Sequence, residues 1–166
     1  YCYRVAGTVG IMVLHIMGFR DSRAYQYSRA MAEAFQLTNI LRDVWEDHER
    51  DRCYLPLNLL DQCGARRDWR ERRRSGPLLT VCRQLGRRAR IRYRQCLPLF
   101  DYVPKRSRFP LAVMTAAYSQ YLHQMETRGY LPEPGELRLS RRCLPRFLMK
   151  SWRASRGRAE SCLSIV

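Results

Sequence analysis

One amide and two carboxylates recur at every fourth position along a helical segment of this chain. Asn39, Asp43 and Asp47 fall within residues 36–47, and a spacing of four places their side chains on one stripe of a helix. Apolar residues flank the stripe, so most of this helix is expected to be buried. Two carboxylates on a partly buried face repel each other unless a cation lies between them. The pattern therefore restricts the chain to folds in which this stripe meets a cation or water.

A hard divalent cation is one way to satisfy such a stripe. Mg²⁺ accepts one or two protein carboxylates, keeps several waters and binds substrate phosphates through its remaining positions. The alternative is a solvated charged face on an amphipathic helix. The polar run 46–52 favours this alternative, because the helix becomes solvated there. The stripe alone leaves both interpretations open.

Apolar residues elsewhere recur with helical spacing, and no run alternates as a strand does. The clearest pattern lies between 77 and 101, where apolar residues step by three or four: Leu78, Cys82, Leu85, Ala89, Tyr93, Cys96 and Phe100. Further helices are expected over residues 1–18, about 23–50, 56–64, 110–128 and 141–155, with Pro104 and Pro110 bracketing a connection. We therefore predict an all-α fold.

The charge of the chain is divided unequally. Residues 1–64 carry a net charge of −1, and the remaining residues carry +17. Opposite the apolar face of the 77–101 helix lies a stripe of Arg83, Arg87, Arg90 and Arg94. No recognised nucleic-acid-binding motif accompanies it, so no specific nucleic acid partner is expected. The stripe and the basic run 66–74 could instead make a peripheral contact with an anionic membrane, or be solvated.

The cysteines and the longest apolar run limit where the protein works. The seven cysteines form no C-x-x-C pair and do not join the three histidines at zinc-ligand spacings. An odd number of cysteines spread through helical patterns predicts reduced, packed thiols. The run Val5–Phe19 is too short to span a membrane. We expect a cytoplasmic protein whose membrane contact, if any, is peripheral.

Three blocks of the sequence resemble the squalene/phytoene synthase family. They are YCYRVAGTVG at 1–10, QLTNILRDVWED at 36–47 and RCYLP at 52–56, and their order and separation also match. A weaker similarity extends over 117–130. The resemblance implies an all-α helical bundle of the isoprenoid-synthase type. It also implies that residues 1–155 form a partial domain, incomplete at the N-terminus because the family's first aspartate-rich motif is absent, and that 156–166 form a frayed tail.

The resemblance also implies a reaction. Members of the family join two allylic isoprenoid diphosphates head to head, through a cyclopropylcarbinyl diphosphate, with Mg²⁺ as cofactor and Mn²⁺ as its alternative. The first two blocks are most similar to the phytoene synthase branch, which predicts conversion of geranylgeranyl diphosphate to phytoene. Presqualene, squalene or dehydrosqualene synthesis from farnesyl diphosphate is the alternative, and a basic nucleic-acid-binding helical module is a remote one. With half of the aspartates, the chain alone is expected to be inactive.

Roles for individual residues follow from the matched blocks. The resemblance assigns catalysis to Tyr1, Asp43 and Asp47, and metal binding to Asn39, Asp43 and Asp47. Diphosphate contacts are expected from Gln36, Asn39, Arg42, Arg52 and Tyr54, with an exposed ion pair to Glu46 as the alternative for Arg42. Val5, Val9 and Leu37 are expected to line a prenyl tunnel, and Tyr118 either its far end or the core.

Overall fold

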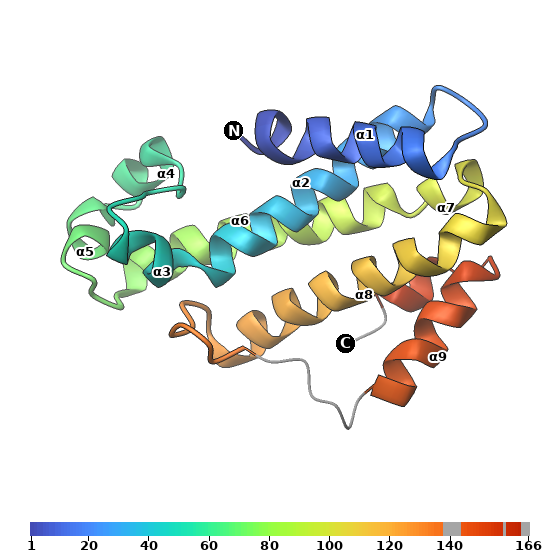
Figure 1. Cartoon of the computed structure of the whole chain (residues 1–166). Helices are drawn as coiled ribbons and strands as arrows, with labels where there is room; N and C mark the ends of the chain where they lie inside the picture. The colour runs from blue at the N-terminus through green and yellow to red at the C-terminus, as the bar shows by residue number, and fades with distance from the viewer. Residues whose placement is uncertain (138–143, 158, 164–166) are drawn as a thin grey trace.

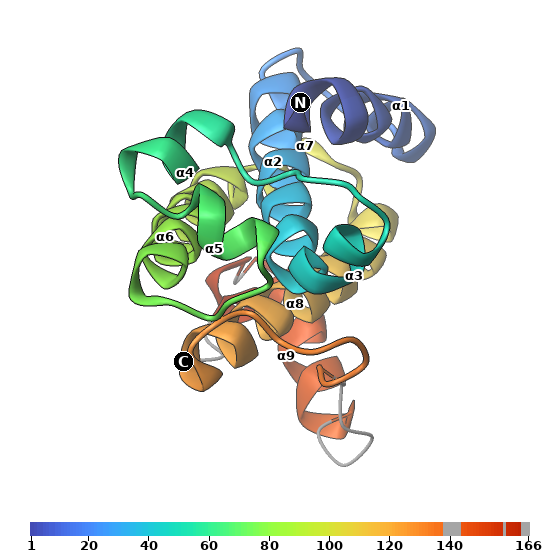
Figure 2. The same ribbon diagram turned by 90° about the vertical axis from the view of Figure 1, so that its left-hand side faces the viewer.

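Three long helices form the centre of the structure (Figures 1 and 2). They are α2 (Ala24–Arg42), α6 (Gly76–Cys96) and α8 (Lys105–Arg128), and each packs against the other two. The computed structural model describes residues 1–137, 144–157 and 159–163. Within these ranges there is no strand, which confirms the all-α prediction.

Shorter helices complete the two ends of the bundle (Figure 1). A π-helical turn, η1 (Tyr3–Gly7), leads into α1 (Thr8–Met17), which lies against α2. At one end gather α3 (Val44–Glu49), α4 (Leu57–Gln62) and α5 (Arg66–Arg70). At the other end lie α7 (Leu99–Tyr102) and α9 (Leu144–Ser155), followed by a short 3₁₀ helix, η3 (Ala159–Cys162).

Local sequence explains where several helices begin and end. The Ser75 hydroxyl accepts a hydrogen bond from the Leu78 N–H at 3.2 Å, and Pro77 occupies the first turn of α6. Helix α8 ends at Gly129, whose φ of 84° is available to glycine at little cost. The helix predicted between Pro56 and Gly64 is present as α4.

Three predicted helix boundaries are wrong. The helix expected over 23–50 is interrupted at Asp43, whose φ of −102° and ψ of 14° separate α2 from α3. The helix expected over 77–101 ends at Cys96, and α7 follows as a separate turn. Pro110 does not bracket a connection, because it lies inside α8. Its missing N–H removes one bond near the start of that helix, and the other bonds and the packing of α8 keep the helix continuous.

The apolar core has two parts. One lies between the second half of α2, α3, α4 and α6 and contains Leu41, Trp45 and Tyr93. The other lies between the first half of α2, α1, α7 and α8 and contains Leu14 and Phe100. Of the predicted frayed tail 156–166, η3 packs against α8 and α9, whereas residues 158 and 164–166 lie outside the described residues.

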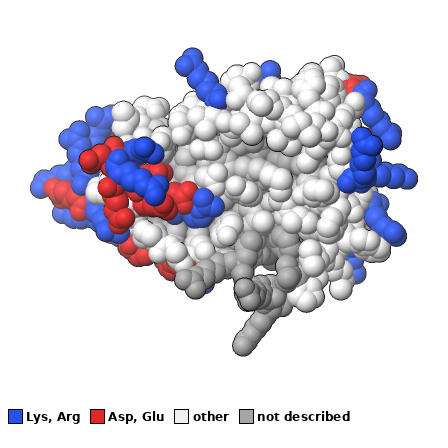
Figure 3. All heavy atoms as spheres, viewed as in Figure 1, with Lys and Arg blue, Asp and Glu red and all other residues white. Residues whose placement is uncertain are grey.

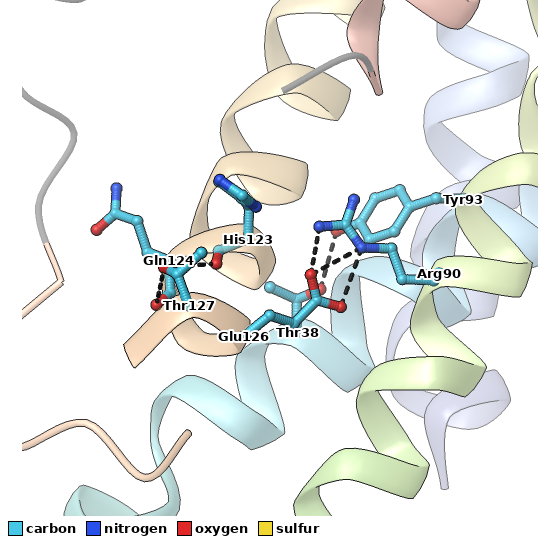
Figure 4. A network of polar contacts seen from close by, with 7 residues as sticks. All are labelled: Thr38, Arg90, Tyr93, His123, Gln124, Glu126 and Thr127. Atoms are coloured by element: carbon cyan, nitrogen blue, oxygen red, sulfur yellow. Dashed lines mark hydrogen bonds and ion pairs between the residues drawn. The ribbon is translucent and has the colours of Figure 1, made fainter. Parts of the chain in front are cut away.

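Polar contacts connect the three long helices inside the bundle (Figure 4). The Thr38 hydroxyl of α2 and the Tyr93 hydroxyl of α6 lie 2.9 Å apart, and burial raises the pKa of Tyr93. The guanidinium of Arg90 on α6 binds both carboxylate oxygens of Glu126 on α8, at 2.5–3.0 Å. Arg90 was expected on a solvated stripe. It is largely buried because it faces α8.

Candidate active site

An apolar cavity of about 290 Å³ lies between α1, α2 and α8. Its walls include Val5, Val9, Gly10, Leu14 and Met17 from the N-terminal helices; Met31, Ala32, Phe35, Gln36 and Asn39 from α2; and Leu111, Met114 and Tyr118 from α8. The predicted tunnel residues Val5 and Val9 therefore face a cavity, and Tyr118 reaches the same cavity while stacking on Phe35 at 4.4 Å. On the α1 side the wall is open, because Val5 and Val9 remain about half exposed.

The cavity has a polar end and an apolar end. Helix α1 runs antiparallel to α2, and α8 runs parallel to it (Figure 1). Gln36 and Asn39 therefore lie at the end near Val5, while Met17 and Leu111 lie at the other end. The wall formed by α2 from Ser28 to Asn39 is roughly 16 Å long at 1.5 Å per residue. This shape suits a long apolar chain with a polar group at one end.

A glycine allows α1 to approach α2 closely at this wall. A Cβ atom on Gly10 would lie 3.1 Å from the Cβ of Ala32 and 3.2 Å from the Ser28 hydroxyl. These distances are shorter than almost all ordinary contacts of a Cβ atom, so a side chain here would push the helices apart. Gly10 both permits the helix contact and lines the cavity.

The polar stripe continues across the break between α2 and α3. The Asp43 N–H donates to the Asn39 carbonyl at 2.9 Å, and the Asp47 N–H donates to the Asp43 carbonyl at 2.8 Å. These two bonds keep the spacing of one helical turn, so Asn39, Asp43 and Asp47 remain stacked although the helix is interrupted. Asn39 opens on the apolar cavity, and Asp43 opens on a neighbouring polar pocket of about 320 Å³.

Arg42 forms an ion pair with its neighbour Asp43. Its Nε lies 2.7 Å from Oδ1 and its Nη2 lies 2.8 Å from Oδ2, a bidentate arrangement. Both side chains are about two-thirds to three-quarters shielded from solvent, and the hydrogen bonds to Asp43 raise the pKa of Arg42. The alternative partner predicted for Arg42, Glu46, instead pairs with Arg50 at 2.8 Å.

The second carboxylate of the stripe lies in an unfavourable electrostatic environment. Partial burial, followed by the negative charges of Asp43 and Glu46, raises the pKa of Asp47 above its ordinary value. Arg50 and Arg52 lower it, but by less. Ionised Asp47 is therefore a site where a further cation would be stabilised.

The remaining predicted site residues lie around a second cavity or at the surface. Tyr1 stacks on Tyr54 with ring centroids 4.9 Å apart, and partial burial, Tyr54 and Asp47 together raise the pKa of Tyr1. Both tyrosines line a cavity of about 630 Å³ on another side of α2. Leu37 lies there too, and not with Val5 and Val9, because adjacent helical residues point about 100° apart and Gln36 already faces the first cavity. Arg52 is exposed.

The sequence of this chain is similar to the sequences of known proteins. The squalene/phytoene synthase family model matches residues 1–143. The chain belongs to the squalene/phytoene synthase family. It is 39% identical over 119 residues to 15-cis-phytoene synthase of Enterobacter agglomerans, covering 71% of this chain and 40% of that protein. It is 35% identical over 130 residues to presqualene diphosphate synthase of Zymomonas mobilis, covering 78% of this chain and 45% of that protein.

Solved structures of the squalene/phytoene synthase family share the fold. A dehydrosqualene synthase crystallised with a ligand superposes with a TM-score of 0.78 at 26% identity, covering 95% of this chain and 56% of that one. Squalene synthase from Alicyclobacillus acidocaldarius superposes with a TM-score of 0.75 at 29% identity, covering 80% of this chain and 51% of that one. The chain thus spans about half the length of the relatives it matches. No helix in the described part of the chain is long and apolar enough to cross a membrane.

The stripe residues fit the divalent cation that this family fold implies. The side-chain oxygen of Asn39 is buried and has no hydrogen-bond partner within the described part of the chain. A buried acceptor without a donor is costly, and coordination to a cation would satisfy it. Asp43 and Asp47 supply the negative charge, and the donors are hard oxygen atoms of the kind Mg²⁺ prefers. The described residues bring together no group of three His, Cys, Asp or Glu side chains, so the stripe offers two carboxylates and an amide.

One residue at the site was not predicted from the sequence. Tyr121 on α8 lies beside Asp43 in the polar pocket, and the Arg42 guanidinium lies 5.5 Å from the centre of its ring. That position is within the range of a cation–π contact, which holds Arg42 against Asp43. Tyr121 follows Tyr118 by three residues and so lies on a nearby part of the helix surface. Only the packing of α8 on α2 reveals the contact.

Neutralising Asp47 should stabilise the fold. Because the folded state raises the pKa of this carboxyl, the folded protein binds its proton more tightly than the unfolded chain does. Its ionisation therefore costs stability as pH rises through the interval between 3.8 and the raised value. We expect Asp47→Asn, without divalent cation at neutral pH, to melt at the same temperature as the wild type or higher. A marked fall in melting temperature, with no such fall at pH values below that interval, would contradict the electrostatic assignment.

Proposed function

We propose that this chain provides one half of the active site of an enzyme that condenses two allylic isoprenoid diphosphates head to head. The preferred reaction is conversion of geranylgeranyl diphosphate to phytoene through a cyclopropylcarbinyl diphosphate. The observation that carries this proposal is the oxygen-rich stripe of Asn39, Asp43 and Asp47 where an apolar cavity ends. A diphosphate at the stripe would place its prenyl chain along the cavity. Relatives named phytoene synthase and presqualene diphosphate synthase support this reaction class.

The chain's own residues have distinct tasks in this proposal. Asn39, Asp43 and Asp47 would hold Mg²⁺, or Mn²⁺ as the alternative, and the bound cation would supply positive charge that offsets the negative charge of the leaving diphosphate. Arg42 and Arg52 bind diphosphate oxygens, for which the planar guanidinium is well suited. Gln36 lies at the same end of the cavity and contacts the diphosphate or its metal shell. Tyr1 and Tyr54 lie near Asp47 and act at the leaving group or the cation that forms.

The apolar walls protect the reaction. A carbocation in contact with water would be quenched, so the cavity must exclude water during the reaction. Leu14, Ala32 and Leu111 contribute saturated hydrocarbon side chains, which have no lone pair or π electrons to attack a cation. We propose that the part of the domain outside this chain covers the exposed apolar face of α1, which includes Met12 and Ile16, and supplies the opposing carboxylates.

Product analysis of the complete protein tests the proposal. Purified protein with Mg²⁺ is offered geranylgeranyl diphosphate or farnesyl diphosphate, and the lipid products are identified by mass. Phytoene from the first substrate supports the preferred reaction, and presqualene diphosphate, squalene or dehydrosqualene from the second supports the alternative. The 166-residue chain alone serves as the negative control, because it carries half of the metal site. No condensation product from either substrate would overturn the proposal.

A large side chain at position 32 should shorten the usable cavity. Ala32 is buried on α2 and lines the cavity between the polar end and Met17. We expect Ala32→Phe to lower kcat/KM for geranylgeranyl diphosphate about tenfold more than for farnesyl diphosphate, because a cavity wall discriminates chains by whether their terminal carbons fit. Steady-state kinetics with both substrates measure this ratio. Gln95→Phe serves as the control, because Gln95 is exposed. Ala30→Phe would not serve, because Ala30 is buried. An unchanged ratio in Ala32→Phe would contradict the expected orientation of the prenyl chain.

A further inference from the structure

Helix α9 presents an unusual combination of exposed side chains. Leu148, Met149 and Trp152 are 40%, 54% and 48% exposed, although all three are large and apolar. They are separated by one, three and four residues along the sequence, which places them on one side of the helix. Ser151 and Ala154, which point away from this face, are fully buried. The helix packs against α8 and η3, so it is anchored with its apolar side chains directed outward.

Basic residues border this exposed face. Arg153 and Arg156 are both exposed, and within the described residues neither forms an ion pair. The guanidinium of Arg156 lies 4.2 Å from the centre of the Trp152 ring, so a cation and an indole are presented together. Between 144 and 157 the sequence contains four basic residues and no acidic one. The face is therefore apolar at its centre and positive at its edge.

Other basic segments of the chain differ from α9. In the run 66–74, Arg66 pairs with Asp61, Arg67 with Glu71, Arg72 with Glu49 and Glu133, and Arg73 with Asp68. Figure 3 shows these acidic (red) and basic (blue) side chains interleaved at the end of the molecule that carries α3 to α5. On α6, Arg83 and Arg87 are exposed, but Ile91 is the only large apolar side chain exposed on that helix. Only α9, among the described helices, joins exposed Trp and Met to unpaired arginines.

We propose that the exposed face of α9 binds the surface of an anionic lipid bilayer. A helix lying in the interface buries its apolar face at the boundary between headgroups and acyl chains, while its basic residues remain among the anionic headgroups. Leu148, Met149 and Trp152 supply the apolar part, and Arg153 and Arg156 the charge complementarity. Nucleic acid would match the arginines but would leave the apolar side chains unused. Three apolar side chains give weak binding alone, so attachment is reversible and needs both parts.

Vesicle sedimentation of the complete protein tests the assignment. We expect it to sediment with vesicles of equal parts phosphatidylcholine and phosphatidylglycerol, to remain soluble with phosphatidylcholine alone, and to be released at high salt. Arg153→Gln with Arg156→Gln should weaken binding about 25-fold, because each basic residue near such a surface contributes about a factor of five. Met149→Ser with Trp152→Ser should weaken it about tenfold or more.

Matched variants on α6 make the outcome decisive. Ile91 is 54% exposed, as Met149 is, so Ile91→Ser controls for removal of an exposed apolar side chain. Arg83→Gln with Arg87→Gln controls for loss of two exposed charges. Both controls should bind as the wild type does, and circular dichroism melts confirm that every variant is folded; the arginine pair on α9 gives an independent result if the serine pair unfolds. If the complete protein binds neither vesicle, or if the α6 variants lose binding while the α9 variants keep it, the proposal is overturned.

Discussion

Replacing Asp43 with Asn in the complete protein should lower turnover by about a thousandfold while leaving the fold intact, because the proposed metal site would lose one of its two carboxylates and would stabilise the leaving diphosphate far less. The substitution changes charge and hardly changes shape. Asp43 lies at the junction of α2 and α3, and the amide can still accept a hydrogen bond from Arg42. Steady-state rates at saturating Mg²⁺, together with a thermal melt, measure the two parts of this expectation.

A second carboxylate provides the matched control for this experiment. Asp61 also pairs with an arginine, Arg66, at 2.7 Å, the same distance that separates Arg42 from Asp43. Asp61 is about half exposed on α4 and lines none of the cavities described above. We expect Asp61→Asn to keep full turnover. Equal rates for the two variants would show that Asp43 contributes only its ion pair and would remove the main support for a metal site.

Gly86→Ala should be among the most destabilising single changes in the molecule, by about 2–3 kcal/mol, the upper part of the usual range for forcing an extra group into a packed core. Gly86 is buried on α6, and a Cβ atom there would overlap the Tyr130 hydroxyl and lie 2.8 Å from the ring carbon Cζ. The ring cannot move away easily. Tyr130 is buried, and both it and Leu131 adopt left-handed backbone conformations, with φ of 61° and 52°. Chemical denaturation of the complete protein measures the free energy of unfolding.

Two companion variants separate this overlap from other effects of alanine. Gly76 begins the same helix and has no atom within 4 Å of an added Cβ, so Gly76→Ala should be nearly neutral. In a Tyr130→Leu background the overlapping hydroxyl is absent, and Gly86→Ala should then cost much less than in the wild type. A similar cost in both backgrounds would mean that Tyr130 is not what fills the space beside Gly86.

The sequence predicts the helices well where burial and periodicity agree, as for α6, whose apolar residues follow one face and whose start has a serine cap and a proline. The interruption at Asp43 was missed because the helical hydrogen bonds from the Asp43 N–H to the Asn39 carbonyl and from the Asp47 N–H to the Asp43 carbonyl persist through it. A periodic pattern cannot distinguish one helix from two that keep this spacing. The position of Pro110 inside α8 was missed for a different reason, since tertiary packing offset a local penalty.

At the candidate site, the sequence predicts which residues share a stripe but not what each one touches. Asn39, Asp43 and Asp47 are related by local geometry, so their stacking follows from spacing alone. The stacking of Tyr1 on Tyr54 and the contact of Tyr121 with Arg42 join distant parts of the chain. Leu37 was grouped with Val5 and Val9 by resemblance, and the angle between adjacent helical residues places it on another side of α2. Long-range contacts of this kind depend on how the helices pack.

The ion pair between Arg42 and Asp43 has a consequence for the order in which ligands bind. While the pair is intact, Asp43 already has a positive partner, and Arg42 already has a negative one. On the proposed function, a cation arriving at Asp43 must displace the guanidinium, and a diphosphate arriving at Arg42 must displace the carboxylate. Either ligand alone would leave one charged group without its partner in a partly buried site. When the cation and the diphosphate bind together, two new ion pairs replace the single pair between Arg42 and Asp43. Binding of each ligand would therefore strengthen binding of the other by the same factor. Such a site would bind a preformed metal–diphosphate complex more readily than it would bind the metal or the diphosphate alone.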